Sequence, residues 1–315
     1  MTTALPSAQV GRTGLQVSRL GLGTAPLTGK NGSIPESQSV ATIRAALSAG
    51  VTLIDTAPLY GAGRSEQRVG DALQGIPREN YVLSTKVGRL VLPDGAVIFD
   101  FSRDGVLRSL EQSLERLKLD RVDLLLVHDP DDAEQQALGQ AFPTLVELRA
   151  QGVIGAIGAG MNQWQMEDRF AANFDIDCFL LAGRYTLLEQ TALEFLGRCQ
   201  ARGIGIFLGG VYNSGILAMG ARPGATYNYA APPPAIVERV QQIEAICARY
   251  DVPLHRAAAQ FALAHPAVTA VLLGAVLPAE VQANRDALFA PIPPALWADL
   301  KGAGLLREDA PVPAE

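Results

Sequence analysis

The hydrophobic positions of this chain form short apolar runs, which are separated by longer stretches with apolar residues at helical spacing. Eight runs rich in Val, Ile and Leu have the length of single strands: residues 19–23, 51–54, 81–85, 122–127, 154–158, 178–181, 205–208 and 270–273. The stretches between them predict helices at residues 35–49, 65–73, 104–117, 134–150, 165–173, 189–202, 234–248 and 255–264. Strand and helix therefore alternate along most of the chain.

The continuous apolar character of the runs predicts a parallel sheet that is covered on both faces. Eight such strands alternating with helices are typical of an α/β (β/α)8 TIM barrel. A doubly wound open sheet is the alternative, but it needs fewer strands, and no GxGxxG opens a first helix. Residues 9–17, with Gly11 and Gly14 as turn residues, predict a short N-terminal β-hairpin that closes the amino-terminal end of the barrel.

Composition favours one domain over residues 1–315. The chain is 48% hydrophobic and 18% charged, and no Ser/Gly/Pro-rich linker divides it. A net charge of −6 without a dense basic run, and the lack of a membrane-length apolar segment, argue against nucleic acid or a membrane as partner. We therefore expect a small-molecule partner and a monomer or homodimer.

The ends of the chain and its cysteines indicate a cytoplasmic protein. The first residues have no apolar core of a secretory signal. Cys178, Cys199 and Cys247 are odd in number and widely spaced, so we expect buried thiols and neither disulfides nor a zinc site. The C-terminal segment AGLLREDAPVPAE contains proline and acidic residues and is expected to fray.

Polar side chains follow the predicted strands at the end where barrel active sites are built. Asp55 follows the second strand, Lys86 the third and His128 the fourth, and Tyr60 lies five residues beyond Asp55. A lysine at the mouth of a barrel needs a carboxylate partner, which Asp55 on the adjacent strand supplies. Each residue alone has a plainer explanation, because an aspartate often caps a turn and a histidine can simply end a strand.

Together the four residues are suited to acid–base chemistry. A phenol titrates near pH 10, and a neighbouring ammonium lowers the pKa, so we expect Lys86 to activate Tyr60 and Asp55 to hold Lys86 in place. Tyr60 would remove a hydroxyl proton during alcohol oxidation or donate one during carbonyl reduction, with His128 orienting the substrate oxygen. Hydride transfer needs a separate carrier, which implies a nicotinamide. The three histidines are too scattered for a metal site.

The segments around these residues resemble the signatures of the aldo-keto reductase family. The matching segments are GVTLIDTAPLYGAGRSEQRVGDAL, with Asp55 and Tyr60, then YVLSTKVG, with Lys86, and RLKLDRVDLLLVHDPD, with His128. The resemblance extends from GLQVSRLGLGT to about Asn284. It implies a (β/α)8 barrel that uses NAD(P).

Within the family, the chain is most similar to aldose 1-dehydrogenases of the L-fucose, L-galactose and D-threo-aldose type. The segments that carry this likeness are FDFSRDGVLRSLEQSLERL, LAGRYTLLEQ and VYNSGIL. Such enzymes oxidise the anomeric carbon of a pyranose to a lactone. The alternatives are a pyridoxal 4-dehydrogenase, another carbonyl reductase, a barrel enzyme that binds no nicotinamide, and a cofactor-binding regulatory subunit without turnover.

The resemblance also implies residues that contact the cofactor. Tyr185 would stack on the nicotinamide, and the glycine-rich loop after the seventh strand would wrap the pyrophosphate. Met161 stands where the family often has serine, and Ala182 where it often has glutamine. The full set of expected cofactor contacts is Gly23, Thr24, Asn162, Tyr185, Gly209, Gly210, Asn213, Ser214, Gly215, Leu217, Gly274, Val276, Glu280 and Asn284.

Two further expectations concern specificity. Relatives that prefer NADPH commonly place Arg or Lys two residues after Gly274, but this chain has Val276 and then Leu277. A phosphate without a cation binds poorly, whereas a ribose hydroxyl can use Glu280, so we predict NAD as the preferred cofactor, with NADP possible. The loops at residues 88–101 and 211–229 should shape the substrate pocket, with Arg89, Trp164 and Tyr212 as candidate contacts.

Overall fold

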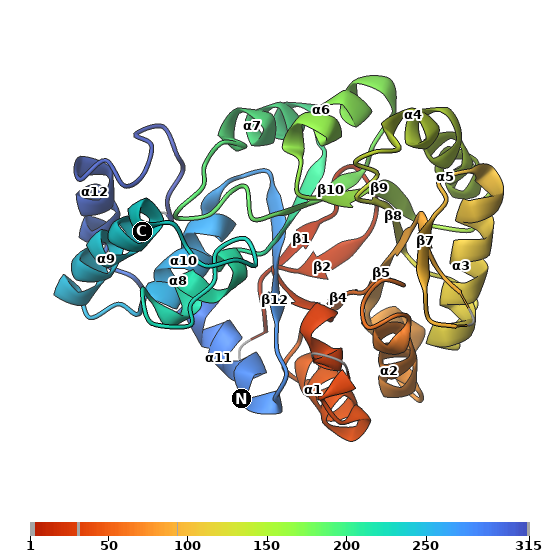
Figure 1. The fold of residues 1–315 in the computed structure, drawn as a ribbon, viewed down its shortest axis with the longest axis horizontal. Coiled ribbons are helices and arrows are strands. Elements are labelled where there is room, and N and C mark those ends of the chain that lie inside the picture. Colours follow the sequence, from red (N-terminus) through yellow and green to blue (C-terminus); the bar gives the residue numbers. More distant parts are fainter. Residues whose placement is uncertain (1–3, 30–31, 93, 314–315) are drawn as a thin grey trace.

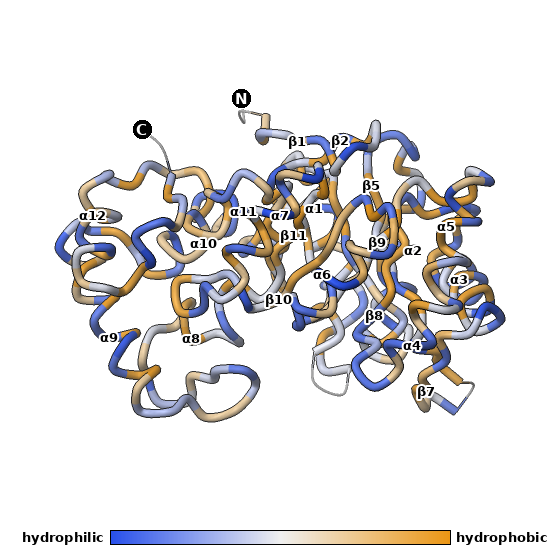
Figure 2. The backbone as a smooth tube through the Cα atoms, turned by 90° about the horizontal axis from the view of Figure 1, so that it is seen from above, coloured by the Kyte–Doolittle hydropathy of each residue, from blue (hydrophilic) through white to orange (hydrophobic). Residues whose placement is uncertain are grey.

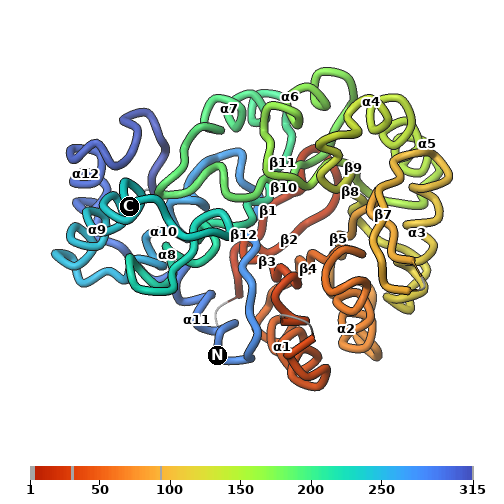
Figure 3. Tube along the Cα trace, in the orientation of Figure 1, coloured from red at the N-terminus to blue at the C-terminus, as the bar shows by residue number. Residues whose placement is uncertain are grey.

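Eight parallel strands close into a barrel in the computed structural model, which describes residues 4–29, 32–92 and 94–313 (Figure 1). The barrel strands are β3 (Leu20–Gly23), β4 (Leu53–Asp55), β5 (Val82–Val87), β8 (Leu124–His128), β9 (Ala156–Met161), β10 (Cys178–Ala182), β11 (Gly205–Gly209) and β12 (Val268–Gly274). They follow one another in chain order, and β12 pairs with β3, so the first and last strands lie side by side (Figure 3). The predicted (β/α)8 barrel is confirmed, and the open-sheet alternative is wrong.

The strands are apolar on both faces because each face packs into a different core. Along β8, Leu124 and Leu126 point into the barrel, where they pack with Leu53 and Phe207. Leu125 points outward into the larger core between strands and helices. Successive strand residues face opposite sides, so a continuous apolar run fills both cores at once. This packing explains why the strands carry no inside–outside alternation of polarity.

The predicted hairpin at the N-terminus is present as β1 (Ser7–Gln9) and β2 (Gln16–Ser18). Val10 and Val17 are buried in the inner core of the barrel, so the hairpin closes its amino-terminal end. The turn requires Gly11, whose φ is +50° and whose Cβ would lie 2.1 Å from the Asp177 carbonyl oxygen. Figure 2 shows β1 and β2 at one end of the molecule, with β7 and the segment between α8 and α9 at the other.

Helices surround the barrel, and α8, α9 and α12 extend the ring on one side (Figure 1). The helices are α1 (Glu36–Ser48), α2 (Arg64–Leu73), α3 (Arg103–Leu117), α4 (Glu134–Gln136), α5 (Phe142–Ala150), α6 (Trp164–Asn173), α7 (Leu193–Arg202), α8 (Ile216–Met219), α9 (Pro234–Arg249), α10 (Leu254–Ala264), α11 (Pro278–Phe289) and α12 (Pro294–Gly302). Short 3-10 turns are η1 (Ala25–Thr28), η3 (Arg78–Asn80) and η5 (Asn213–Gly215). The hydrophobic pattern did not predict α11 or α12.

The helix predicted for residues 134–150 is interrupted. A π-helical turn, η4 (Ala137–Ala141), separates α4 from α5. Pro143, near the start of α5, has no N–H to donate to the residue four positions earlier, and a wider turn accommodates that missing bond. The prediction of one continuous α-helix was therefore wrong at its centre.

The C-terminal segment is packed against the domain over its described residues, so the prediction that it frays was wrong there. Leu305, Leu306 and Ala310 are buried. The Arg307 backbone N–H donates to Gln190 Oε1 at 2.8 Å. The two leucines outweigh the polar composition of the segment, because burying them removes apolar surface from water.

The loop after β5 contains a second hairpin, β6 (Arg89–Val91) and β7 (Val97–Phe99), where the sequence suggested only a loop. The three cysteines are free and buried, as expected. Within the described ranges, no helix combines the length and the apolar character needed to cross a membrane.

A buried carboxyl on α6 is left without a hydrogen-bond partner. Glu167 is 0% exposed, and neither of its carboxyl oxygens has a partner among the described residues. Burial, reinforced by the charge of Asp129, raises the pKa of Glu167 well above 4.5. Because the pKa is higher in the folded protein than in the unfolded chain, ionisation of Glu167 opposes folding. The free energy of unfolding therefore falls as the pH rises from the unfolded pKa to the folded-state pKa.

Glu167→Gln should therefore stabilise the protein, and the gain should grow with pH. The advantage is expected to increase by up to about 1.4 kcal/mol per pH unit above the unfolded pKa, until the folded-state pKa is reached. Thermal unfolding of both proteins from pH 4.5 to 8 measures this gain. The exposed Glu111→Gln on α3 is the matched control. A Glu167→Gln protein with the same stability difference at every pH would contradict the expectation.

Candidate active site

The carboxyl ends of three neighbouring strands bring the predicted residues together. Asp55 ends β4, Lys86 lies near the end of β5, and His128 ends β8. Tyr60 comes from the loop after β4 and reaches the same centre, with its ring edge-on to His128 at a centroid distance of 6.0 Å. The strand-end positions alone thus predicted a real cluster.

Lys86 is the hub of this cluster. Its Nζ donates to Asp55 Oδ2 at 2.8 Å and Oδ1 at 3.0 Å, to the Thr56 carbonyl at 2.8 Å and to Tyr60 Oη at 3.2 Å. The side chain is only 1% exposed. Burial by itself lowers the pKa of Lys86, but the Asp55 charge and the hydrogen bonds outweigh it, so the pKa is raised. The lysine is therefore a permanent, buried cation.

Tyr60 differs from expectation in its net pKa. Burial raises the pKa of Tyr60 above its usual value, and this effect outweighs the lowering caused by Lys86. Lys86 acts in the predicted direction, but the prediction of a lowered pKa was wrong, because it left out desolvation of the phenolate. The phenol of Tyr60 is thus protonated at neutral pH.

Side chains behind the cluster hold it in place, and the sequence analysis missed them. Ser84 Oγ donates to Asp55 Oδ1 at 2.9 Å. Next along β5, Thr85 Oγ1 donates to Glu66 Oε1 at 2.6 Å, and Arg116 pairs with the other Glu66 oxygen at 2.7 Å. Glu66 is completely buried. This network ties β5 to α2 and α3 and so fixes the strand that carries Lys86.

His128 is neutral and presents one nitrogen to the mouth. Burial, with the charges of Lys86 and Arg89, lowers the pKa of His128 well below its usual value. Its Nδ1 is enclosed and without a hydrogen-bond partner, while Nε2 lies 3.6 Å from Asp129 Oδ2. A carboxylate beside Nε2 favours the tautomer with its proton there. His128 is therefore suited to donate a hydrogen bond to a ligand oxygen.

A cavity of about 460 Å³ adjoins the cluster and extends over the ends of β10, β11, β12 and β3. Asp55 and Tyr60 form one edge, and Glu280 contributes a second carboxylate. The predicted residues that line it are Gly23, Gly209, Gly210, Tyr212, Ser214, Gly215, Gly274, Val276 and Glu280. Lining residues that were not predicted from the sequence are Ala25, Pro26, Leu180, Ala182, Leu272, Leu273 and Ala275. Val211 and Tyr229, which also line it, are the ends of the 211–229 loop that was predicted to shape the pocket.

Tyr229 is the last residue of the 211–229 loop that was predicted to shape the pocket, although it was not named as a contact. Its side chain is 90% exposed although it lines the cavity. Its φ of +63° is rare outside glycine, and its backbone N–H donates to Ser214 Oγ at 3.0 Å. Both ends of the predicted 211–229 loop therefore reach the cavity.

Several side chains predicted to contact the cofactor or substrate are used inside the protein instead. Tyr185 is 1% exposed and stacks on Phe261 at 5.1 Å, so its ring is not presented to the cavity. Leu217 is buried in the main core, and Trp164 stacks on Phe195 at 6.2 Å. The stacking role expected of Tyr185 was wrong, because a residue just past a strand can turn outward toward the helices. The contacts expected of Leu217, through its backbone, and of Trp164 stay predictions.

Three more predicted contacts have hydrogen-bond partners within the protein. Thr24 Oγ1 donates to the Asp55 carbonyl at 2.9 Å. Asn213 is buried, and its Oδ1 accepts from Thr186 Oγ1 at 2.6 Å, which joins the loops after β10 and β11. Asn162 is exposed beyond β9, and Asn284 donates from Nδ2 to the Gly274 carbonyl at 3.0 Å. Thr24 and Asn213 thus shape the mouth through its backbone.

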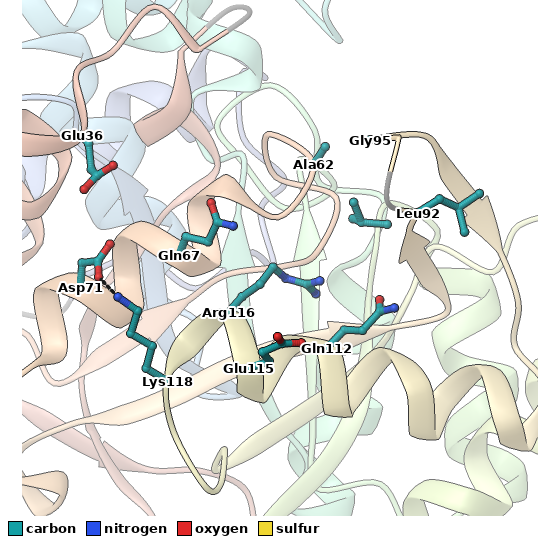
Figure 4. Close-up of a pocket in the computed structure, with 11 residues that line it drawn as sticks. Glu36, Ala62, Gln67, Asp71, Leu92, Gly95, Gln112, Glu115, Arg116 and Lys118 are labelled. Carbon is teal, nitrogen blue, oxygen red and sulfur yellow. Dashed lines mark hydrogen bonds and ion pairs between the residues drawn. The ribbon is translucent and has the colours of Figure 1, made fainter.

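A second cavity of about 660 Å³ lies outside the barrel, between α2, α3 and the β6–β7 hairpin (Figure 4). Figure 4 shows Lys118 paired with Asp71, and Arg116 is the residue that pairs with Glu66. The remaining labelled lining residues are Glu36, Ala62, Gln67, Leu92, Gly95, Gln112 and Glu115. Its cations already have carboxylate partners and none of the four cluster residues faces it, so the barrel mouth is the candidate active site.

Comparison with known proteins agrees with this geometry. The sequence model of the Aldo/keto reductase family matches residues 19–304. The chain is 39% identical to the pyridoxal 4-dehydrogenase of Microbacterium luteolum, over 94% of this chain and 97% of that protein. It is 38% identical to the D-threo-aldose 1-dehydrogenase of a Pseudomonas species, over 97% and 99%.

The chain belongs to the aldo-keto reductase family.

A solved structure shares the whole architecture. The holo form of an aldo-keto reductase from Bacillus halodurans superposes with a TM-score of 0.80 at 26% identity, covering 99% of both chains. Aldo-keto reductases use NAD(P)H, and the present protein is therefore an NAD(P)-dependent oxidoreductase. The oxidoreductase relatives favour an enzyme over a regulatory subunit without turnover.

The mouth fits a nicotinamide dinucleotide in two respects. The cavity extends from Tyr60 to Val276 and Glu280, so an elongated ligand can place one end beside the phenol. At Gly215, where φ is +114°, an added Cβ would meet no atom within 4 Å, so the backbone there borders open space. Backbone of this kind can approach a ligand closely. Residues from β11 and β12 would hold the cofactor, and Tyr60 would face its reactive end.

Lys86→Met should lower both activity and stability, because it leaves Asp55 buried without its cation. We expect a stability loss of about 3–5 kcal/mol. The double variant Lys86→Met/Asp55→Asn should recover much of this loss but none of the activity. Urea unfolding of wild type, the Asp55→Asn and Lys86→Met single variants and the double variant measures the coupling. Additive losses in the double variant would show that the pair is not coupled.

Proposed function

We propose that the protein oxidises the hemiacetal carbon of a cyclic aldose to a lactone, with NAD+ as the hydride acceptor. The observation that carries the proposal is the Lys86–Asp55–Tyr60 cluster at the edge of the dinucleotide-sized cavity. The similarity to D-threo-aldose 1-dehydrogenase supports an aldose of the L-fucose, L-galactose or D-threo type.

The chain's own residues account for the proton in this reaction. A bound nicotinamide would supply the hydride acceptor. Tyr60 first releases its own proton to solvent and then, as the phenolate, takes the proton of the hemiacetal hydroxyl, and the carbon–oxygen bond becomes the lactone carbonyl as hydride leaves the carbon. Lys86 stabilises that phenolate from 3.2 Å. His128 donates from Nε2 to the same oxygen, which keeps the substrate oriented.

Pyridoxal is a second candidate substrate, which the similarity to pyridoxal 4-dehydrogenase favours. In water pyridoxal also closes to a cyclic hemiacetal, and its oxidation also gives a lactone. The two candidates therefore share the reacting group, and the same active-site residues serve both. What separates them is the ring that the substrate half of the mouth accepts.

The cavity supports a preference for NAD over NADP. Its described lining contains the carboxylates of Asp55 and Glu280 and no Lys, Arg or His. Glu280 Oε2 accepts from the Val276 backbone N–H at 2.7 Å, which holds this carboxylate at the end of the cavity. A 2′-phosphate would meet negative charge there, whereas a ribose hydroxyl can donate to it.

Initial rates of NADH formation test the proposal directly. L-Fucose, L-galactose, D-arabinose and pyridoxal would each be assayed with NAD+ and with NADP+. Turnover of an aldose with lactone as product supports the aldose assignment, and turnover of pyridoxal alone moves the substrate to the second candidate. Lack of turnover with every compound and both cofactors would overturn the proposed function.

Tyr60→Phe should reduce kcat by at least about a thousandfold, because it removes the group that takes the proton. NAD+ affinity should change little, since the ring and its packing are kept. Turnover assays and a titration of intrinsic fluorescence with NAD+ measure the two effects separately. Wild-type rates in Tyr60→Phe would exclude the phenol from proton transfer.

Val276→Arg should raise kcat/KM for NADP+ about tenfold or more relative to NAD+, because it adds a cation where the lining has none. The matched control is Ala279→Arg, which adds the same charge at an exposed position on α11. Steady-state kinetics with both cofactors provide the comparison. Equal gains in the two variants would point to a general charge effect and not to a 2′-phosphate site at Val276.

A further inference from the structure

An ion pair beside His128 takes no part in the proton transfer to Tyr60. Asp129 directly follows β8, and Arg89 begins β6. Arg89 Nη2 donates to Asp129 Oδ2 at 2.9 Å, and Arg89 Nε donates to the His128 carbonyl at 3.3 Å. One guanidinium thus contacts both residues at the end of β8.

The backbone of Asp129 is held in an unusual conformation beside His128. Its φ is +38°, which residues other than glycine rarely adopt. The Asp129 N–H donates to the Gly160 carbonyl at 3.2 Å, which anchors the turn to β9. In this conformation Oδ2 lies 3.6 Å from His128 Nε2. Strained backbone at a functional site commonly places a side chain where function requires it.

The pair retains hydrogen-bonding capacity. The side chains of Arg89 and Asp129 are 15% and 23% exposed, so both are reachable. A guanidinium has five N–H donors, and within the described part of the chain Arg89 Nη1 has no hydrogen-bond acceptor. The Phe99 ring of β7 lies over the guanidinium at 4.9 Å, and Phe99 is itself exposed. A carboxylate therefore lies beside a guanidinium that has an unused donor, and the guanidinium is in contact with an aromatic ring.

We propose that Asp129 and Arg89 bind the hydroxyl group on the carbon next to the reacting carbon. The inference rests on the proposed function, which places the reacting oxygen between Tyr60 and His128 Nε2. With Nε2 and Asp129 Oδ2 3.6 Å apart, oxygens on two neighbouring carbons can bond to one group each. The neighbouring hydroxyl donates to Asp129 and accepts from Arg89, while Phe99 covers the apolar face of the substrate.

This assignment defines a substrate class. It requires a hydroxyl group on the adjacent carbon, as in 2-hydroxyaldoses and small 2-hydroxyaldehydes. In pyridoxal the ring hydroxyl is one carbon farther from the reacting carbon, so the pair fits the aldose better. Buried or half-buried polar groups that are left unpaired disfavour an analogue lacking the hydroxyl.

The test combines a change of substrate with a change of residue. D-Arabinose and 2-deoxy-D-ribose differ by the hydroxyl at carbon 2, as do glycolaldehyde and acetaldehyde in the reduction direction with NADH. Wild type should prefer the hydroxylated member of a pair by about tenfold or more in kcat/KM. Asp129→Gly fits the positive φ while deleting the carboxylate, and it should reduce this preference to about threefold or less.

Matched variants separate recognition from support of His128. Asp132→Gly makes the same change at an exposed position of the same loop and should keep the wild-type preference. Arg89→Lys keeps the positive charge but loses the planar set of guanidinium donors, so it should also reduce the preference. This variant provides the test if Asp129→Gly does not fold. Asp129→Asn should restore part of the preference, because the amide oxygen can still accept.

The outcomes separate this inference from the proposed function. If the wild-type enzyme turns over the hydroxylated and the deoxy substrate with equal kcat/KM, the inference is overturned and the proposed function stays in place. If Asp129→Gly and Arg89→Lys keep the wild-type preference, the ion pair does not read the hydroxyl group and the inference is overturned. If both variants lose all turnover, the ion pair serves to hold His128, which also overturns the inference. Turnover of pyridoxal, with no turnover of either the sugars or the small aldehydes, also overturns the inference, while the oxidoreductase activity stands.

Discussion

The buried ion pair between Lys86 and Asp55 is the interaction on which the site depends. Two charges almost removed from water are stable only when each has its partner and further hydrogen bonds. The Thr56 carbonyl, the Ser84 hydroxyl and Tyr60 supply those bonds. Because neighbouring parallel strands must be in register for this pair to form, the barrel and the proton-transfer group are specified together.

The mouth of the barrel divides into two halves with different character. The half over β10, β11, β12 and β3 is a cavity with glycine-rich walls and acidic edges. The half over β5 and β8 carries His128 and the Arg89–Asp129 pair. Tyr60 lies between them, in contact with Lys86 and edge-on to His128. This division matches a reaction in which a cofactor in one half exchanges hydride with a substrate in the other half, whose oxygen lies near Tyr60 and His128.

Much of the fold and the centre of the site could be predicted from the sequence. Buried parallel strands leave a strong local signal, and the residues at the carboxyl end of each strand are displayed at the mouth, so Asp55, Lys86 and His128 could be predicted directly. The apolar runs ended slightly too early, because each of the three residues lies within its strand. What lies behind them could not be found this way. The Glu66–Arg116 pair joins two helices, and no local pattern states that distant side chains share a buried site. Tyr185 failed for a related reason, because position after a strand does not determine the direction of a side chain.

The closure of the barrel between β3 and β12 has a consequence for how the protein acquires its cavity. These strands are the first and last of the barrel, and Gly23 and Gly274, opposite each other in this pairing, both line the cavity. On the ribosome, β3 emerges early and must wait as an unpaired edge until β12 has been synthesised. Such sequence-distant contacts form late because a long loop must close first. One wall of the cavity is thus built from segments that lie far apart in the sequence, so the cavity is complete only when the barrel is closed.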